Sequence, residues 1–125
     1  KRQPLLVREL RPAVANAASQ EFQSKLIDKL PISQATLQVI RDGMTRVVQD
    51  PRGTAYNVFK GSNLDAAGKS GTAEDQGLSD HVLFVAFAPR TAPKAVAVVV
   101  LDNGQSGSLE AGPIVRDALE NYLGR

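Results

Sequence analysis

Residues 80–102 read DHVLFVAFAPRTAPKAVAVVVLD and contain two apolar runs separated by a short polar connection. The first run, 80–89, is apolar on both faces of an extended chain, as is typical of a central strand. The second run, 94–102, is rich in β-branched residues, which favour strands. The connection, RTAP, is short enough for a hairpin. This stretch therefore predicts two neighbouring antiparallel strands.

A third strand is predicted just upstream, where residues 66–74 read AAGKSGTAE. In an extended chain Ser70 and Thr72 share one face, and Lys69 and Gly71 share the other. Two hydroxyls can donate to one carboxylate, and a lysine adds a point positive charge. Backbone N–H groups of an edge strand can pair with a peptide or donate to an oxyanion. From these residues alone, a peptide-binding strand and an ordinary solvated turn both remain open.

Helices are predicted on either side of the strands. Apolar residues recur at helical spacing after a possible N-cap at Ser33, which predicts an amphipathic helix over 33–49. A second apolar stripe predicts a C-terminal amphipathic helix over 114–123. Between these helices, DPRGT (50–54) is a turn by composition, and NGQSGS (103–108) is a glycine-rich loop.

Three segments are assigned more loosely. YNVF (56–59) is expected as a short strand within a loop, and LLVREL (5–10) as another short strand. EFQSKLIDKL (21–30) fits either a strand or a helical turn. The resulting order of helix, three antiparallel strands and helix predicts an α+β fold, in which helices pack on an antiparallel sheet.

Composition excludes several classes of function. The chain has 125 residues, a net charge of +2 and only 5% aromatic residues, with no tryptophan and no basic run, so we expect no nucleic-acid partner. It has no cysteine and a single histidine, His81, so neither a metal site nor a cofactor is expected. His81 begins a predicted strand and is assigned a structural role. No stretch reaches the roughly 18 apolar residues of a membrane span.

The whole pattern resembles the C-terminal part of the transpeptidase domain of class B penicillin-binding proteins, most closely the elongation-type penicillin-binding protein 2. The resemblance runs from about Pro4 to Leu123, is weakest over 11–30, and implies that residues 1–125 form one portion of a β-lactamase/transpeptidase-like fold. The matching segments are PLLVREL (4–10), SQATLQVIRDGMTRVVQDPRGTAYNVF (33–59), AAGKSGTAE (66–74), DHVLFVAFAPRTAPKAVAVVVLDNG (80–104) and AGPIVRDALENYL (111–123).

The resemblance implies a serine acyltransferase of peptidoglycan synthesis, whose K-[ST]-G motif is matched by Lys69-Ser70-Gly71. Lys69 would sustain the positive field, and Ser70 and Thr72 would hold the carboxylate of a D-Ala-D-Ala stem peptide or a β-lactam. The Thr72 N–H would form one arm of the oxyanion hole. The implied partners are the stem peptide, β-lactams and cell-wall elongation proteins. The implied location is the outer face of the bacterial cytoplasmic membrane, facing the periplasm, with the membrane anchor outside this chain.

The sequence departs from the family pattern at the nucleophile. No serine of this chain has lysine three positions later, and S-x-N is also absent. The chain is therefore expected to be a fragment that is inactive alone and exposes apolar surface. A non-catalytic module that binds peptides or cell-wall proteins is the alternative. A serine β-lactamase or β-lactam sensor also stays open.

Overall fold

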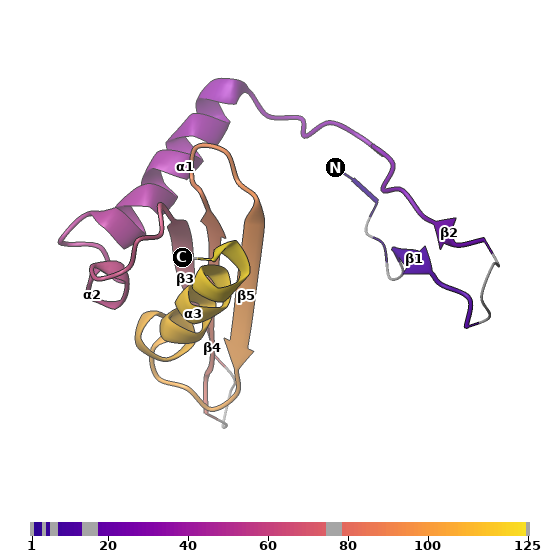
Figure 1. Ribbon diagram of the computed structural model, residues 1–125. Helices are drawn as coiled ribbons and strands as arrows, with labels where there is room; N and C mark the ends of the chain where they lie inside the picture. Colours follow the sequence, from indigo (N-terminus) through magenta and orange to yellow (C-terminus); the bar gives the residue numbers. More distant parts are fainter. Residues whose placement is uncertain (1, 4, 6–7, 14–17, 75–78, 125) are drawn as a thin grey trace. The chain divides into compact units, whose positions relative to one another are not determined.

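The computed structural model describes residues 2–3, 5, 8–13, 18–74 and 79–124, and its chain divides into two compact units, Lys1–Ser33 and Gln34–Arg125 (Figure 1). In the first unit, β1 (Glu9–Leu10) pairs antiparallel with β2 (Gln20–Glu21). Arg2 and Leu26 form an isolated bridge. The expected strand at 5–10 is therefore confirmed at its end, while residues 6 and 7 lie outside the described part. The segment 21–30 begins in a strand, and its described residues contain no helical turn.

The second unit holds the predicted helices and sheet. The helix α1 (Gln34–Gln49) begins within one residue of its predicted start. The strands β3 (Ala67–Ala73), β4 (His81–Ala88) and β5 (Ala95–Leu101) form an antiparallel sheet in the order β3-β4-β5. The π-helical segment η1 (Gly107–Ala111) leads directly into α3 (Gly112–Leu123). The α+β fold with an antiparallel sheet is therefore confirmed.

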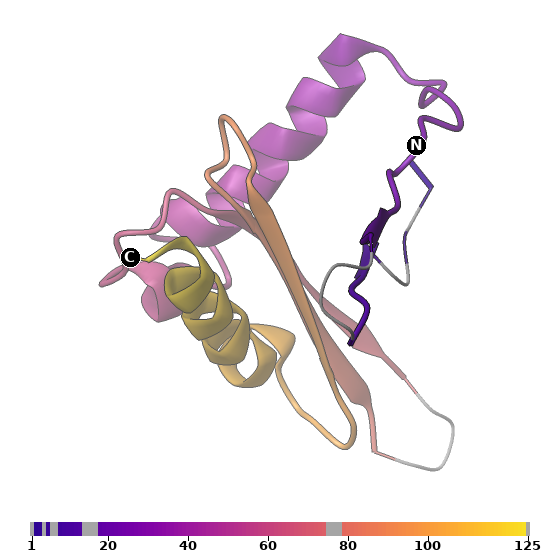
Figure 2. The same cartoon turned by 45° about the vertical axis from the view of Figure 1, so that its right-hand side comes forward.

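The core lies between one face of this sheet and the helices (Figure 2). Alternate residues of β4 are fully buried there, because side chains on a strand point to opposite faces in turn. The Phe84 ring stacks against Phe59 with ring centroids 5.9 Å apart. The helices contribute the other large buried side chains, which include Val48, Val115 and Leu119.

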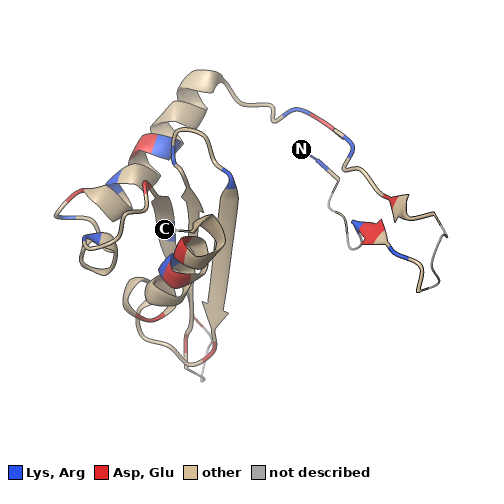
Figure 3. Cartoon of the chain, viewed as in Figure 1, with Lys and Arg blue, Asp and Glu red and all other residues tan. Residues whose placement is uncertain are grey.

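The opposite face of β5 is apolar and exposed. Val96, Val98 and Val100 are 67%, 59% and 59% exposed. They lie opposite the half-buried β4 residues Phe87, Val85 and Leu83. Neither β4 nor β5 contains Asp, Glu, Lys or Arg, and the body of the β5 arrow is tan in Figure 3. The two faces of β4 and β5 therefore differ strongly in burial.

Two sequence predictions in this unit were wrong. YNVF is not a strand but a helical turn, α2 (Tyr56–Phe59). The Phe59 N–H donates to the Ala55 carbonyl, and this one-turn spacing points both Ala55 and Phe59 into the core. The expected loop 103–108 ends in helical structure, because η1 already begins at Gly107. A four-residue apolar run does not distinguish strand from helix, and tertiary burial decided between them.

The turn between α1 and α2 requires glycine at position 53. A Cβ placed on Gly53 would lie 2.2 Å from the Arg46 carbonyl oxygen and 2.4 Å from that of Val47. The adjoining Ala55 N–H donates to the Val47 carbonyl. The chain therefore folds back directly on the last turn of α1. No helix in the described part of the chain has the length and apolar character needed to cross a membrane.

Candidate functional site

The residues Lys69 to Thr72 lie in the middle of β3, at the edge of the described sheet. Lys69 is opposite Val85, Gly71 is opposite Leu83, and Thr72 is opposite Val82. Lys69 and Thr72 are exposed, while Ser70 and Gly71 are half-buried. The neighbouring Ala67 and Gly68 are fully buried. The motif therefore begins where β3 leaves the core and becomes accessible to solvent.

The register separates the motif side chains between the two faces of the sheet. Ser70 and Thr72 lie on the same face as Phe84 and Val82, which is the helix-covered face. Lys69 and Gly71 lie on the face of Val85 and Leu83. Two hydroxyls and one ammonium therefore flank the same short length of strand from opposite sides.

Backbone geometry decides which N–H groups of β3 face outward. A Cβ placed on Gly107, in η1, would lie 2.4 Å from the Leu83 carbonyl oxygen and 2.8 Å from that of Gly71. Two opposite carbonyl oxygens approach one point this closely only in a hydrogen-bonded antiparallel pair, where both are directed between the strands. Consequently the N–H and C=O of Gly71 face β4, and those of Ser70 and Thr72 face the outer edge.

At that outer edge, β3 pairs with no other strand within the described residues. The Lys69 ammonium donates a hydrogen bond to the Ser70 carbonyl oxygen. Because this carbonyl faces outward, the ammonium lies near the same edge as the Thr72 N–H. The edge thus presents one positive charge, the N–H donors of Ser70 and Thr72 and their two hydroxyls, which is a set of groups suited to a carboxylate and an oxyanion.

The structure also contains a pair of polar side chains, His81 and Asp102, that the sequence analysis did not identify. His81 lies opposite Ala73, and its Nδ1 is 2.9 Å from Oδ1 of Asp102. Both side chains are accessible to solvent. The register of the predicted β4–β5 hairpin, which places position 81 opposite position 102, is the signal that could have found this pair. It joins the ends of β4 and β5 and is consistent with the structural role assigned to His81.

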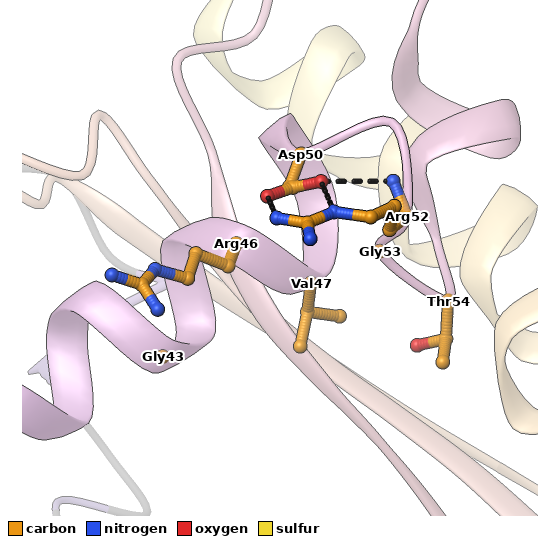
Figure 4. Close-up of a pocket in the computed structure, with 7 residues that line it drawn as sticks. All are labelled: Gly43, Arg46, Val47, Asp50, Arg52, Gly53 and Thr54. Carbon is orange, nitrogen blue, oxygen red and sulfur yellow. Dashed lines mark hydrogen bonds and ion pairs between the residues drawn. The ribbon is translucent and has the colours of Figure 1, made fainter.

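A separate hollow of about 330 Å³ lies at the C-terminal end of α1 (Figure 4). Asp50 and Arg52 form a two-pronged ion pair in it, with contacts of 3.0 and 3.1 Å. Hydrogen bonds from the Arg52 side chain and backbone N–H lower the pKa of Asp50 to about 2, and the positive charges of Arg52 and Arg46 contribute. Because the two charges satisfy each other and no residue of 69–72 lines the hollow, we do not assign it to the candidate site.

Comparison with known proteins identifies relatives. The family model described as "Penicillin binding protein transpeptidase domain" matches residues 1–120. Peptidoglycan D,D-transpeptidase MrdA of Haemophilus influenzae is 31% identical over 131 residues, which cover 91% of this chain and 20% of that protein. The chain therefore spans about one fifth of the length of this curated relative.

Solved structures of penicillin-binding proteins also resemble this chain. The chain superimposes on Pseudomonas aeruginosa PBP2, crystallised with WCK 5153, with a TM-score of 0.70 and 40% identity over 77% of this chain and 21% of that one. It also matches PBP2 of Helicobacter pylori from a complex with MreC, with a TM-score of 0.65 and 29% identity over 83% of this chain and 20% of the other.

Proposed function

The chain belongs to the family of penicillin-binding protein transpeptidase domains, and we propose that it supplies the K-S-G strand of an elongation-type peptidoglycan D,D-transpeptidase. In this proposal residues 1–125 form the C-terminal portion of the transpeptidase domain in a longer polypeptide. The observation that carries the proposal is the position of Lys69-Ser70-Gly71-Thr72 on a sheet edge, with the Thr72 N–H directed outward.

Each motif residue has a separate role in this proposal. Ser70 and Thr72 are two residues apart on one face, and their Cα atoms are thus roughly 6–7 Å apart along the strand. That separation allows both hydroxyls to donate to the two oxygens of one carboxylate. Lys69 adds a positive charge without forming part of the covalent chemistry. Gly71 carries no side chain that would obstruct a peptide lying along the edge.

The reaction is a two-step acyl transfer. A serine hydroxyl attacks the carbonyl carbon of the D-Ala-D-Ala peptide bond, loses its proton to a base and expels the terminal D-alanine as an amine. A second stem-peptide amine then attacks the acyl-enzyme and restores the serine. The Thr72 N–H stabilises the negative charge on the carbonyl oxygen in both tetrahedral intermediates. Since no serine in this chain starts an S-x-x-K motif, the nucleophile comes from elsewhere in the longer polypeptide.

Acylation by a fluorescent penicillin, followed by intact mass, tests this proposal. The full-length polypeptide should gain one adduct, and residues 1–125 alone should gain none. In the full-length polypeptide, Lys69→Ala should slow acylation by about 100-fold, comparable with the loss of one transition-state donor. Lys60→Ala is the matched control, because Lys60 is also exposed and its ammonium donates to the Asn57 side chain at 3.2 Å, away from the motif. A stoichiometric adduct on residues 1–125 alone would refute the proposal.

A non-catalytic binding module is the second candidate. The absence of S-x-x-K from this chain favours it, and the H. pylori relative was solved in complex with MreC. In this case residues 1–125 alone should bind a D-Ala-D-Ala peptide saturably, and Lys69→Ala or Thr72→Ala should abolish binding. No binding at millimolar peptide would reject this candidate.

The same proposal implies a location and partners. A strand that holds stem peptides acts at the outer face of the cytoplasmic membrane, in the periplasm, where β-lactams also reach it. Cell-wall elongation proteins are the proposed macromolecular partners.

A further inference from the structure

Gly107 packs backbone against backbone behind the K-S-G strand. Its Cα lies over the Gly71–Leu83 pair on the helix-covered face of the sheet, and a Cβ there would lie 2.4 Å from the Leu83 carbonyl oxygen and 2.8 Å from that of Gly71. The atoms in the way belong to the main chain, so no side-chain rotation can relieve the clash. On the other face, a Cβ on Gly71 would lie 2.8 Å from Cγ of Leu83. The Gly71 peptide is therefore confined from both faces of the sheet.

The confined carbonyl is rigidly coupled to the proposed oxyanion donor. The Gly71 C=O and the Thr72 N–H belong to one planar peptide unit. The carbonyl faces β4, and the N–H faces the outer edge where a substrate carbonyl would lie. A displacement of the Gly71 carbonyl therefore carries the Thr72 N–H with it, and a rotation of this peptide about its Cα–Cα axis turns the N–H by the same angle.

A short network of hydrogen bonds fixes Gly107 in place. The Glu110 carboxylate oxygen Oε1 accepts the backbone N–H groups of Gln105 and Ser106 at 2.8 and 2.7 Å. The Ser106 hydroxyl accepts the Leu109 N–H at 3.3 Å. The Gly112 N–H donates to the Gly107 carbonyl. Gly107 thus begins a π-helical turn, and the Glu110 carboxylate of that turn holds the two residues that precede it.

A second glycine anchors this segment to the sheet. A Cβ on Gly104 would lie 2.2 Å from Cγ2 of Val82. The Gly104 N–H donates to the Asp80 carbonyl at 2.9 Å. Both ends of the segment 104–107 therefore contact β4: Gly104 lies against Val82, which is opposite Thr72, and Gly107 lies against Leu83, which is opposite Gly71.

We propose that Gly107 is a positioning residue for the acyl-transfer reaction: the contact of its backbone with the Gly71–Leu83 pair sets the direction of the Thr72 N–H. This inference rests on the proposed function, because it assumes that this N–H stabilises the oxyanion. A side chain at position 107 should misdirect the donor while leaving the Ser70 and Thr72 hydroxyls and the Lys69 charge in place.

The test compares Gly107→Ala with Gly112→Ala in the full-length polypeptide. Gly112 is the matched control, since it is also buried at the same helical segment. Its Cβ would lie 3.6 Å from Cγ1 of Val58 and 3.8 Å from the Gly107 carbonyl oxygen, which are both ordinary van der Waals contacts. Stopped-flow acylation by a penicillin gives the acylation rate constant and the dissociation constant of the complex before acylation. We expect Gly107→Ala to lower the rate constant by about tenfold or more and to change the dissociation constant little, because small displacements of preorganised groups are costly in the transition state.

The two proposals fail in different ways. If Lys69→Ala acylates like the wild type, the proposed function fails and the positioning role fails with it. If Lys69→Ala is slow while folded Gly107→Ala matches Gly112→Ala in its acylation rate constant, only the positioning role is refuted. The positioning role is also refuted if Gly107→Ala raises the dissociation constant by the same factor by which it lowers the acylation rate constant. General damage to the strand would weaken binding in this way.

A second pair of variants applies if Gly107→Ala does not fold. Glu110→Ala removes the acceptor for two N–H groups, whereas Glu110→Gln keeps an oxygen acceptor in place. We expect Glu110→Ala to lower the acylation rate constant and Glu110→Gln to retain most of it. Equal, wild-type rate constants in both variants would overturn the inference.

Discussion

Arg90 and Asp65 are joined by two hydrogen bonds, one between side chains and one between backbones. The Arg90 guanidinium Nε lies 2.5 Å from the Asp65 carboxylate, and the Arg90 N–H donates to the Asp65 carbonyl at 2.7 Å. Arg90 follows β4 and Asp65 precedes β3, so the pair fastens the turn between β4 and β5 to the segment that enters the motif strand. Both side chains are more than 40% exposed, and water therefore weakens the ionic part of the contact.

We expect a double-mutant cycle of Arg90→Ala and Asp65→Ala to give a coupling free energy of about 0.5–1 kcal/mol from urea unfolding. The coupling should shrink in molar salt, because an exposed ion pair is screened. Arg41→Ala, at an exposed arginine on α1, should show no coupling to Asp65→Ala. A coupling that is absent, or unchanged by salt, would contradict this role.

The stacked pair Phe59 and Phe84 should dominate the core. Phe84 is fully buried, so we expect Phe84→Ala to lower the free energy of unfolding by about 3–5 kcal/mol, through lost burial and the cavity left behind. Val98→Ala, at an exposed position on β5, is the control and should change it by less than about 1 kcal/mol. Chemical denaturation of both variants measures the difference. If the two variants lose similar amounts of unfolding free energy, the core is not centred on β4.

Two glycines of the α1 region should respond to alanine in opposite directions. We expect Gly53→Ala to cost about 1–3 kcal/mol, because its Cβ would collide with main-chain atoms of Arg46 and Val47. Gly43 lies inside α1 with no atom within 4 Å of a Cβ. Gly43→Ala should therefore stabilise the protein by about 0.5–1 kcal/mol, the difference in helix propensity. Thermal unfolding of the two variants checks the sign of each change, and a shift in the same direction for both would be evidence against the described turn.

The Asp50–Arg52 pair predicts a pH dependence. Hydrogen bonding to Arg52 lowers the pKa of Asp50 from 3.8 to about 2, so the folded state binds a proton less readily than the unfolded state. The stabilisation is thus fully present above about pH 4 and is lost as the pH falls towards 2. Urea midpoints measured from pH 5 to pH 2 should fall more steeply for the wild type than for Asp50→Asn. Parallel curves would show that the pair adds no stability.

The sequence predicted much of this structure because its patterns are local. The strands β4 and β5 follow from their apolar runs, and the helices α1 and α3 follow from apolar residues at helical spacing. The residues of β3 alone fitted a turn as well as a strand, and the family resemblance favoured the strand, whose alternation then assigns the motif side chains to their faces. The helical turn at 56–59 was missed because a short apolar run fits either structure, and the contact of Phe59 with Phe84 is tertiary. The role of Gly107 was missed for a similar reason. A glycine in a glycine-rich stretch reads as a loop, and only the packed structure brings it against Gly71.

The exposed face of β5 affects how the chain behaves before its fold is complete. The strand reads AVAVVVL, seven residues without charge, proline or glycine, and such windows nucleate cross-β aggregates when they are accessible. Its hairpin with β4 forms from neighbouring residues and therefore early in folding. Within the described residues, β5 pairs only with β4, which leaves its other edge as a template for a second chain. We therefore expect this uncharged strand to promote aggregation of the chain in competition with its folding.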